Sequence, residues 1–268
     1  MTDIETPNPK RRWYQYSLRT LFVLMTLFAI FCSWYAYELK QAAKRRAAVE
    51  AIRRAGGQVY YILDAPDSDG CTRIGEKLPT LVWLQPFTGQ VEVFSVSFSD
   101  AATKVTDAEL QPVGEMPELQ HLFLDGTHIT GDGLKVIEGF TELEVLSLDN
   151  TQVTDAGLKY IHDLPRLRFV DLANTSVTDD GLRHLRELPG LQDLTLDGTQ
   201  IADATLLHLR SFPHLKNLGL DDTQVTDAGL RHLEDLPKLE WLEVINTQVT
   251  DEGVKKLQEA LPNCEIYH

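Results

Sequence analysis

Three histidines recur at a fixed spacing and are the first candidates for metal chemistry. His184, His208 and His232 follow one another at intervals of 24 residues. A zinc site needs imidazole nitrogens that converge on one point, about 2 Å from the ion. Side chains that occupy one position of a repeat form a row instead. We therefore expect a solvated row of polar side chains here and no metal site.

A second candidate is an acidic segment that resembles part of a calcium-binding loop. Residues 67–70 read DSDG, and Glu76 follows six residues after the glycine, as in an EF-hand. The first ligand position of such a loop would be Ala65, whose side chain has no oxygen. Pro66 would also interrupt the flanking helix. The segment is therefore predicted to be a turn.

Catalytic motifs are missing from the sequence. It has no glycine-rich phosphate loop, no G-x-S-x-G elbow and no H-E-x-x-H pair. Its cysteines, Cys32, Cys71 and Cys264, are too few and too scattered for a disulfide framework or a four-ligand zinc site. We expect a protein that is not an enzyme and that uses no cofactor and no metal.

The strongest pattern in the chain is a repeat of 24 residues. Its consensus is L-x-x-L-x-L-x-x-T-x-V-T-D-x-G-L-x-x-L-x-x-L-P-x, and a degenerate unit with Val93, Val96 and Phe98 precedes the regular ones. No unit can bury its own apolar face, so the units must stack into a solenoid. The regular units begin at Leu119, Leu143, Leu167, Leu191, Leu215 and Leu239.

Each unit predicts one short strand and one short helix. Positions 4 and 6 alternate with polar neighbours, which is typical of a strand with one buried face. Positions 16, 19 and 22, such as Leu182, Leu185 and Leu188, have the spacing of a helix face. The residues 178–179, Thr-Asp, precede that helix and are suited to cap it. Proline at position 23, as in Pro189, helps to end it.

This pattern resembles the leucine-rich repeat, and most closely the cysteine-containing subclass of F-box substrate receptors. The resemblance covers residues 93–262 and implies an α/β solenoid, with parallel strands on the concave face and short helices on the convex face. It also implies a structural ladder of hydrogen bonds from position 9 to loop backbone. That position usually holds Asn or Cys, but here it is Thr127, Thr151, Thr175, Thr199, Thr223 and Thr247.

A second resemblance concerns the start of the chain. The segments 11–22, RRWYQYSLRTLF, and 52–61, IRRAGGQVYY, are similar to the head of bacterial membrane-anchored leucine-rich-repeat proteins. This resemblance implies an architecture rather than an activity. The first 57 residues contain no F-box.

The segment 20–37 is predicted to cross a membrane once. Its 18 residues carry no charge, and as a helix they span about 27 Å, close to the hydrocarbon thickness of a bilayer. A cleaved signal peptide is the main alternative, but the residues at its exit, 34–36, read Trp-Tyr-Ala and lack the small side chains of a cleavage site. Basic residues flank both ends, so the side of the membrane that holds the repeats is undetermined.

The charge of the chain is divided between its two parts. The 268 residues include 25 Lys and Arg and 40 Asp and Glu, for a formal charge of -15, yet residues 1–56 are net basic. An acidic body argues against nucleic acid as a partner. We predict a basic N-terminal segment (1–19), a transmembrane helix (20–38), a basic juxtamembrane helix (39–57), a cap of the solenoid (58–92), about seven repeats (93–262) and a closing strand (263–268).

The outward strand residues of a leucine-rich repeat line its concave face, which here means positions 3, 5 and 7. Seven of the eighteen residues at these positions are acidic and none is Lys or Arg, whereas helix position 17 is basic at Lys135 and Arg183. The predicted partner-binding residues are His121, Phe123, Asp125, Val145, Ser147, Asp149, Phe169, Asp171, Asp193, Thr195, Asp197, Asn217, Asp221, Trp241 and Glu243.

Two interpretations of the acidic residues stay open. Asp197 and Asp221 would lie about 4.8 Å apart on neighbouring strands and repel each other by about 1 kcal/mol, which favours a basic partner. Alternatively, position 7 begins a turn, where Asp is a favoured residue. The aromatic residues Phe123, Phe169 and Trp241 are better evidence, because exposed aromatic side chains commonly anchor interfaces.

We therefore expect a membrane-anchored interaction scaffold or recognition module whose concave face binds a protein with a basic surface. Charge reversal at Asp149 and Asp171 should weaken that binding. One alternative is the substrate-recognition part of a ubiquitin-ligase-like degradation machine, which only the F-box resemblance implies. Another is a sensor of a small peptide or glycan, which would need a closed pocket.

Overall fold

The computed structural model describes residues 10–63, 73–75, 92–99 and 105–268. The acidic segment 67–70 and Cys71 lie outside these residues. The chain divides into two compact units, Met1–Arg46 and Ala47–His268.

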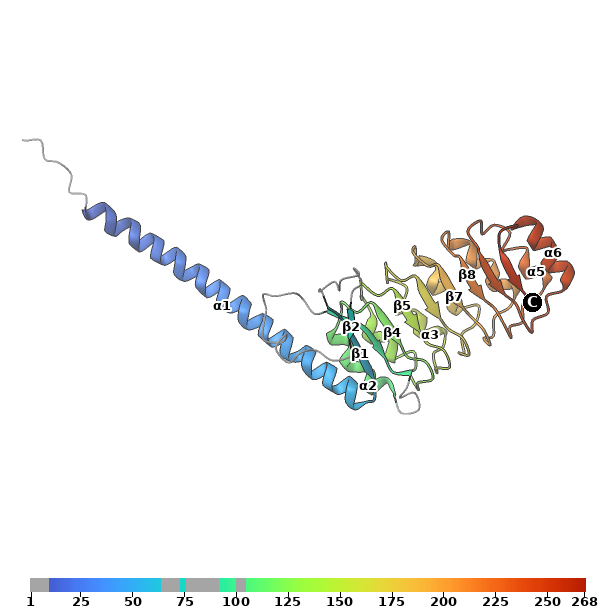
Figure 1. Cartoon of the computed structure of the whole chain (residues 1–268), viewed down its shortest axis with the longest axis horizontal. Coiled ribbons are helices and arrows are strands. Elements are labelled where there is room, and N and C mark those ends of the chain that lie inside the picture. Colours follow the sequence, from blue (N-terminus) through green and yellow to red (C-terminus); the bar gives the residue numbers. More distant parts are fainter. Residues whose placement is uncertain (1–9, 64–72, 76–91, 100–104) are drawn as a thin grey trace, which may run out of the picture. The chain divides into compact units, whose positions relative to one another are not determined.

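The first unit contains most of one long helix, α1 (Lys10–Arg54), drawn in blue in Figure 1. The part of α1 from Thr20 onward includes an apolar stretch of 18 residues, and none of that stretch is buried. Phe22 is 71% exposed and Phe28 is 68% exposed. By length and composition, α1 is therefore able to cross a bilayer.

The second unit is built on one sheet. Its described strands follow the order β10-β9-β8-β7-β6-β5-β4-β3-β1-β2, and those from β3 to β10 are parallel to their neighbours. This confirms the predicted parallel sheet. The repeat strands are β3 (Glu92–Ser97), β4 (His121–Phe123), β5 (Val145–Ser147), β6 (Phe169–Asp171), β7 (Asp193–Thr195), β8 (Asn217–Gly219), β9 (Trp241–Glu243) and β10 (Glu265–Tyr267).

Two antiparallel strands extend the sheet beyond β3. Strand β1 (Gln58–Leu63) pairs with β3 on one side and with β2 (Arg73–Gly75) on the other. Ile52, from the end of α1 that belongs to this unit, is buried in the same core as Phe98. The N-terminal edge of the parallel sheet is therefore paired rather than open.

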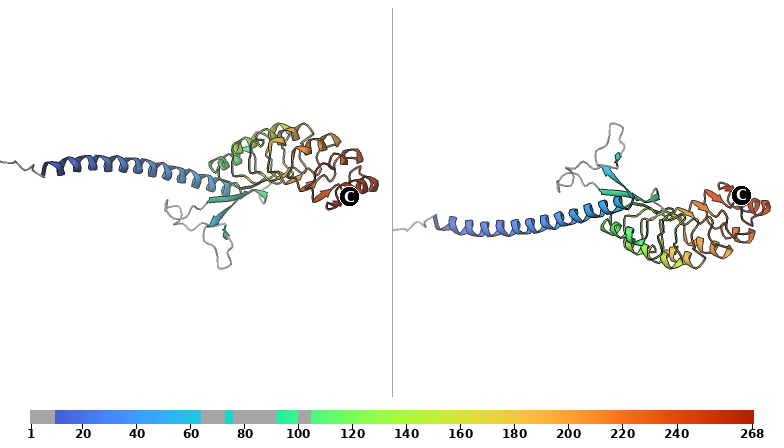
Figure 2. Two further views of the ribbon diagram at one scale, coloured as in Figure 1. Left: turned by 90° about the horizontal axis from the view of Figure 1, so that it is seen from above. Right: turned by 90° about the horizontal axis from the view of Figure 1, so that it is seen from below.

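Short helical segments return the chain from each strand to the next. They line the side of the sheet opposite the exposed strand face, as Figure 2 shows. Most are one or two turns long, as expected for units with only 24 residues. They are α2 (Asp107–Leu110), η3 (Gln111–Glu115), η4 (Gly133–Ile137), α3 (Asp155–Leu158), η5 (Gly181–Glu187), α4 (Asp203–Leu206), η6 (His208–Ser211), α5 (Asp227–Leu230) and α6 (Asp251–Ala260).

The core is a column of leucines that runs through all units. In the unit that begins at Leu143, this residue and Leu146, Leu148, Leu158 and Ile161 have no exposed surface. These are the strand and helix positions that the repeat pattern predicts to be apolar. Because each unit buries its leucines against those of its neighbours, the units depend on one another for stability.

A left-handed residue follows every strand of the regular units, three positions after the strand ends. Position 8 has a φ angle between 52° and 67° in all six, and it is always Gly, Asn or Asp, the residues that adopt this conformation at least cost. The six residues are Gly126, Asn150, Asn174, Gly198, Asp222 and Asn246.

The threonine at position 9 follows this turn and binds back to position 6, the residue directly after the strand of its own unit. Thr127 Oγ1 donates a hydrogen bond to the carbonyl oxygen of Leu124 at 2.6 Å. Five of the six threonines are buried, so the bond satisfies a hydroxyl that water does not reach. The same bond forms at Thr151, Thr175, Thr199, Thr223 and Thr247.

The Thr-Asp pair at positions 12 and 13 joins one unit to the next. Thr178 donates both its N–H and its hydroxyl to the carboxylate of Asp155 in the preceding unit, at 2.7 Å each. We call this arrangement the Asp–Thr link. It occurs at Asp107–Thr130, Asp155–Thr178, Asp203–Thr226 and Asp227–Thr250.

The predicted helix capping is found in only part of the repeats. Thr226 accepts a hydrogen bond from the N–H of Ala228, and Thr250 accepts one from the N–H of Gly253. At residues 178–179 the prediction is wrong, because the helical segment begins after Asp180 and has no side-chain cap bond. The Thr178 hydroxyl donates to Asp155 and accepts a bond from the Asp180 N–H at 3.3 Å, one residue before that segment begins.

Glycine at position 15 makes room for the linking carboxylate. A Cβ atom on Gly181 would overlap Asp155 Oδ1 and lie 2.9 Å from its Cγ. The unit of residues 191–214 departs from the consensus at this position. It has Thr205 at position 15, and the hydroxyl of this residue donates to Asp179 of the preceding unit.

Candidate functional site

The strand register places the predicted partner-binding residues in rows on one face of the sheet. Position 3 forms one row, in which Phe169 is paired with Asp193, and position 5 forms a second, in which Asp171 is paired with Thr195. Position 7 follows the end of each strand. We call the surface formed by positions 3, 5 and 7 the concave face. Whether these residues bind a partner stays a prediction.

One predicted residue contributes little surface to this face. Ser147 is buried, and its hydroxyl donates a hydrogen bond to Asp125 on the neighbouring unit. The alternation of the strand places Ser147 on the correct side, but the Asp125 side chain covers it. Its role is therefore to hold Asp125.

Aromatic rings gather at the N-terminal end of the concave face. The ring of His121 lies 4.1 Å from that of Phe94 and 6.2 Å from that of Phe123. Burial among these rings lowers the pKa of His121, which favours the neutral imidazole. Phe94 lies at position 2, which the repeat pattern does not assign to this face.

A second aromatic pair lies at the C-terminal end. The Trp241 and Tyr267 rings stack with centroids 4.5 Å apart and an interplanar angle of 30°. They remain 37% and 42% exposed. Sequence reasoning missed Tyr267, although extending the repeat numbering by one unit would have placed it at position 5.

An open hollow lies between Phe169 and Trp241. It has a volume of about 380 Å³, and Gly219 forms part of its floor, where a side chain at position 5 would otherwise stand. A Cβ atom on Gly219 would lie 2.7 Å from Asp197 Oδ1 and 3.1 Å from Thr195 Cγ2. The hollow is lined by Phe169, Asp193, Leu194, Thr195, Asn217, Leu218, Gly219, Trp241 and Glu243.

The aspartates at position 7 accept hydrogen bonds within the fold. Asp149 accepts one from Asn150 Nδ2 at 2.8 Å and another from Asn174 Nδ2 at 2.9 Å. Asp125 accepts one from Ser99 Oγ at 3.1 Å. These bonds give position 7 a structural role at the turn, and they offset part of the predicted repulsion between neighbouring carboxylates.

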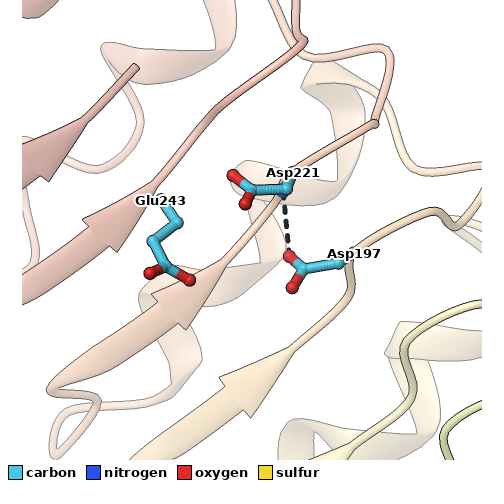
Figure 3. Close-up of side chains that lie close together, drawn as sticks. All are labelled: Asp197, Asp221 and Glu243. Carbon is cyan, nitrogen blue, oxygen red and sulfur yellow. Dashed lines mark hydrogen bonds between the residues drawn. The ribbon is translucent and has the colours of Figure 1, made fainter.

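Three carboxylates approach one another beside the hollow. Ligand oxygens of Asp197, Asp221 and Glu243 lie within 4.8 Å of one another. Figure 3 shows the three side chains. The N–H of Asp221 donates to Asp197 Oδ1 at 2.8 Å, and the N–H of Ile245 donates to Asp221 Oδ1 at 2.7 Å. Backbone bonds thus hold both aspartates at a fixed spacing.

Burial and mutual repulsion make two of these carboxylates harder to ionise. Burial raises the pKa of Asp197 to about 6, and the charges of Asp221 and Glu243 add to that shift. The pKa of Asp221 is also raised, mainly by burial and then by Glu243. On the same face, burial raises the pKa of Asp171, and Asp149 and Asp125 contribute.

This cluster provides few ligands for a metal ion. Calcium takes six to eight oxygen ligands. Three carboxylates, two of which already accept a backbone N–H, provide fewer. Within the part of the chain that the structure describes, no other group of His, Cys, Asp and Glu is this compact. His208, one of the repeated histidines, instead lies against Arg186 on the helical side.

Replacing Asp197 with asparagine is expected to stabilise the repeat domain at neutral pH. Because the pKa of Asp197 is higher in the folded protein than in the unfolded chain, the folded state is favoured when Asp197 is protonated. This contribution to the free energy of unfolding is fully present below about pH 4 and is lost as the pH rises through about 6. The amide keeps an oxygen for the Asp221 N–H but carries no charge. After allowance for solvent screening, the gain in free energy of unfolding should be about 1–2 kcal/mol at pH 7.5 and near zero at pH 4.

Urea unfolding at several pH values measures this effect, with Asp227→Asn as the matched control. Bonds from Thr250 lower the pKa of Asp227, so this variant should lose stability at neutral pH. A gain from Asp197→Asn that persists at pH 4 would show that charge is not its cause.

Comparisons with known proteins find solved structures whose fold is similar to that of this chain. No family model and no curated protein matches the chain. Among solved structures, it is similar to a leucine-rich-repeat protein of Leptospira interrogans, at 20% identity and a TM-score of 0.45, over 59% of this chain and 39% of that one.

Two internalins of Listeria monocytogenes are also similar to it. Internalin C2 matches at 19% identity and a TM-score of 0.47, over 65% of this chain and 80% of its own. Internalin F matches at 19% identity and a TM-score of 0.44, over 59% of this chain and 49% of its own. The chain thus covers less than two thirds of the Leptospira protein and of internalin F. Its own repeat pattern and parallel sheet give it the architecture of a leucine-rich-repeat protein.

Proposed function

We propose that this chain is a membrane-anchored recognition module whose concave face binds a protein partner with a basic surface. The observation that supports this most directly is the make-up of that face. Exposed or half-exposed aromatic and acidic side chains share it, and none of its residues at positions 3, 5 and 7 in the regular units is Lys or Arg.

The charge of the face favours a basic partner for two reasons. Its carboxylates are hard to ionise in the free protein, because burial first and mutual repulsion second raise the pKa values of Asp171, Asp197 and Asp221. A cationic partner would relieve that repulsion. It would also be steered toward the face, so association should slow as the ionic strength increases.

The aromatic residues supply the apolar contacts that such an interface needs. Phe123, Phe169 and Trp241 are spread along the face, at its two ends and its middle. Aromatic residues are enriched at interface centres and dominate their binding energy, whereas charges at the rim mainly set specificity and rate.

The anchoring part of the proposal depends on α1. Its apolar stretch is unburied, and a soluble protein rarely exposes so large an apolar surface. Basic residues follow the stretch, such as Lys40, and suit a position at anionic lipid head groups. The partner is to be sought on whichever side of the membrane holds the repeats.

A small-ligand sensor is the second candidate, because the hollow beside Trp241 offers a recess on an otherwise open face. The recess is too open to enclose a free small molecule. It suits a side chain presented by a larger partner better. The proposed protein interaction therefore accounts for both the open face and the hollow.

Site-specific photocrosslinking in the native host tests the proposal. A benzophenone amino acid at Val145 would stand on the concave face, and the control at Lys135 would stand on the exposed helical side. We expect a discrete crosslinked protein from position 145 and none from position 135. Mass spectrometry would identify it.

Charge reversal then tests the electrostatic part. Asp149→Lys and Asp193→Lys together should reduce the crosslinked product at least tenfold, because like charges that face each other cost several kcal/mol. Asp171 is a poorer choice, since burial raises its pKa and it accepts the backbone N–H of Ala173 at 2.9 Å, whereas Asp149 and Asp193 accept their bonds from asparagine side chains. Equal crosslinking from the two positions, or no loss on charge reversal, would contradict the proposed face.

A further inference from the structure

We propose that the hollow between Phe169 and Trp241 binds the guanidinium group of an arginine side chain from the partner. This inference rests on the proposed function, because it assumes that a basic partner lies on the concave face. It adds the chemical group that the face selects and the place where that group binds.

The size and position of the hollow suit one long side chain. Phe169 and Trp241 occupy the same row three strands apart, which corresponds to about 14 Å along the face. Between them the floor is lowered at Gly219, and the volume of about 380 Å³ is open to solvent. An extended segment of the partner that lies across the strands would be able to insert a side chain there.

Trp241 provides a flat surface for a planar cation. Tyr267 stacks on the indole from the β10 side with centroids 4.5 Å apart, which restrains the ring. Apart from Trp241 and Glu243, which belong to β9, the residues that line the hollow lie on the other side, on β6, β7 and β8. A guanidinium that stacks on an indole gains both a cation–π attraction and planar contact, and tryptophan is the best aromatic residue for this.

Two carboxylates complete the site on either side of Gly219. Asp193 lies at position 3 and accepts a hydrogen bond from Asn217 Nδ2, which orients it. Glu243 lies at position 5, beside Asp197 and Asp221. No basic side chain lines the hollow. Its charge therefore complements a cation.

The geometry favours arginine over lysine. A guanidinium has five N–H donors in one plane, so it can stack on Trp241 and still donate to Glu243 and Asp193 at its edges. An ammonium group is a compact, strongly hydrated point charge that has no face to stack. Lysine should satisfy the carboxylates but lose the contribution of the ring.

The test compares two peptides on the full chain, purified in a neutral detergent. The probes are hexa-arginine amide and hexa-lysine amide, which have the same charge. We expect the wild-type protein to bind hexa-arginine at least fivefold more tightly. Trp241→Leu should weaken hexa-arginine binding about five- to tenfold and abolish the preference. Trp241→Phe, which keeps a ring, should fall between the two.

The charge of the hollow is tested with a matched pair. Glu243→Gln should weaken hexa-arginine binding several-fold. Glu138→Gln removes the same charge from the exposed helical side and should leave the binding unchanged. Neither residue contributes a buried side chain to the core, so both variants should fold. Thermal unfolding checks that they do.

The outcomes separate this inference from the proposed function. If Asp149→Lys weakens hexa-arginine binding but Trp241→Leu does not, the concave face binds cations and the arginine site in the hollow is refuted. Equal affinity of the wild-type protein for the two peptides also refutes it. So does the absence of hexa-arginine binding up to about 1 mM. In that last case, crosslinking from position 145 still decides whether the concave face binds a protein.

Discussion

Replacing Gly181 with alanine is expected to lower the free energy of unfolding of the repeat domain by about 3 kcal/mol. The new methyl group would overlap the Asp155 carboxylate. That carboxylate would have to move away and would lose its bonds to the N–H and hydroxyl of Thr178. The cost combines overpacking with the loss of two charge-assisted hydrogen bonds at a part-buried site.

A double-mutant cycle shows whether the carboxylate is the cause. In an Asp155→Ala background the methyl group no longer meets the carboxylate, and its nearest remaining neighbour is the flexible end of Leu158, with Cδ1 at 3.0 Å. Gly181→Ala should then cost about 1 kcal/mol or less. Alanine also has a higher helix propensity than glycine, which would offset part of the remaining loss in stability. The control is Gly190→Ala, where the new Cβ would make an ordinary contact at 3.4 Å with the carbonyl oxygen of Leu167. Urea unfolding gives the energies, and equal losses in both backgrounds would refute the explanation.

Placing two arginines in the apolar part of α1 is expected to abolish membrane retention. Ile30→Arg, near the centre of the span, should raise the free energy of insertion by about 3 kcal/mol, and Leu24→Arg, nearer its end, should add a smaller cost. The combined effect would shift a stable insertion to a marginal one. Alkaline extraction of membranes, followed by centrifugation, measures the fraction of the protein that stays in the pellet.

The matched control places two arginines outside the apolar stretch. Leu39→Arg and Ala43→Arg stand among basic residues that already follow it, so the protein should stay in the pellet. Retention of the Leu24→Arg, Ile30→Arg variant to the same extent would mean that α1 is not the anchor. The intact mass of the mature protein distinguishes an anchor from a cleaved signal peptide.

The repeat made most of the fold predictable. Six copies of one pattern identify the buried positions far more reliably than one copy would, because accidental apolar residues do not recur. Leu146 and its equivalents were therefore placed correctly on the strands. The register followed as well, since neighbouring strands are related by a shift of 24 residues.

The Asp–Thr link was not predicted, although its residues were recognised. Thr178 next to an aspartate has the sequence of a helix cap, and the residues near it in the sequence favour that interpretation. Only the stacking of units brings Thr178 within hydrogen-bonding distance of Asp155. By contrast, the left-handed turn at position 8 left a usable signal, because all six residues there are Gly, Asn or Asp.

The candidate site was predictable in its location and not in its shape. Alternation along the strands identified the concave face, but the hollow results from departures from the repeat. Gly219 omits a side chain at position 5, and Tyr267 supports Trp241 from a strand beyond the regular units. A consensus averages over such differences. The hydrogen bonds of Asp125 and Asp149 also required three-dimensional neighbours.

The Asp–Thr link joins only adjacent units, and this makes the array modular. Removing the 24 residues 191–214 would place Asp179 opposite Thr226 and Gly229, a regular combination of linking residues. The shortened solenoid would keep a link at that junction, yet it would lose Asp193 and Thr195 from the wall of the hollow. Duplication or loss of whole repeat units can therefore change which partner the concave face recognises, while the hydrogen bonds between the remaining units stay the same.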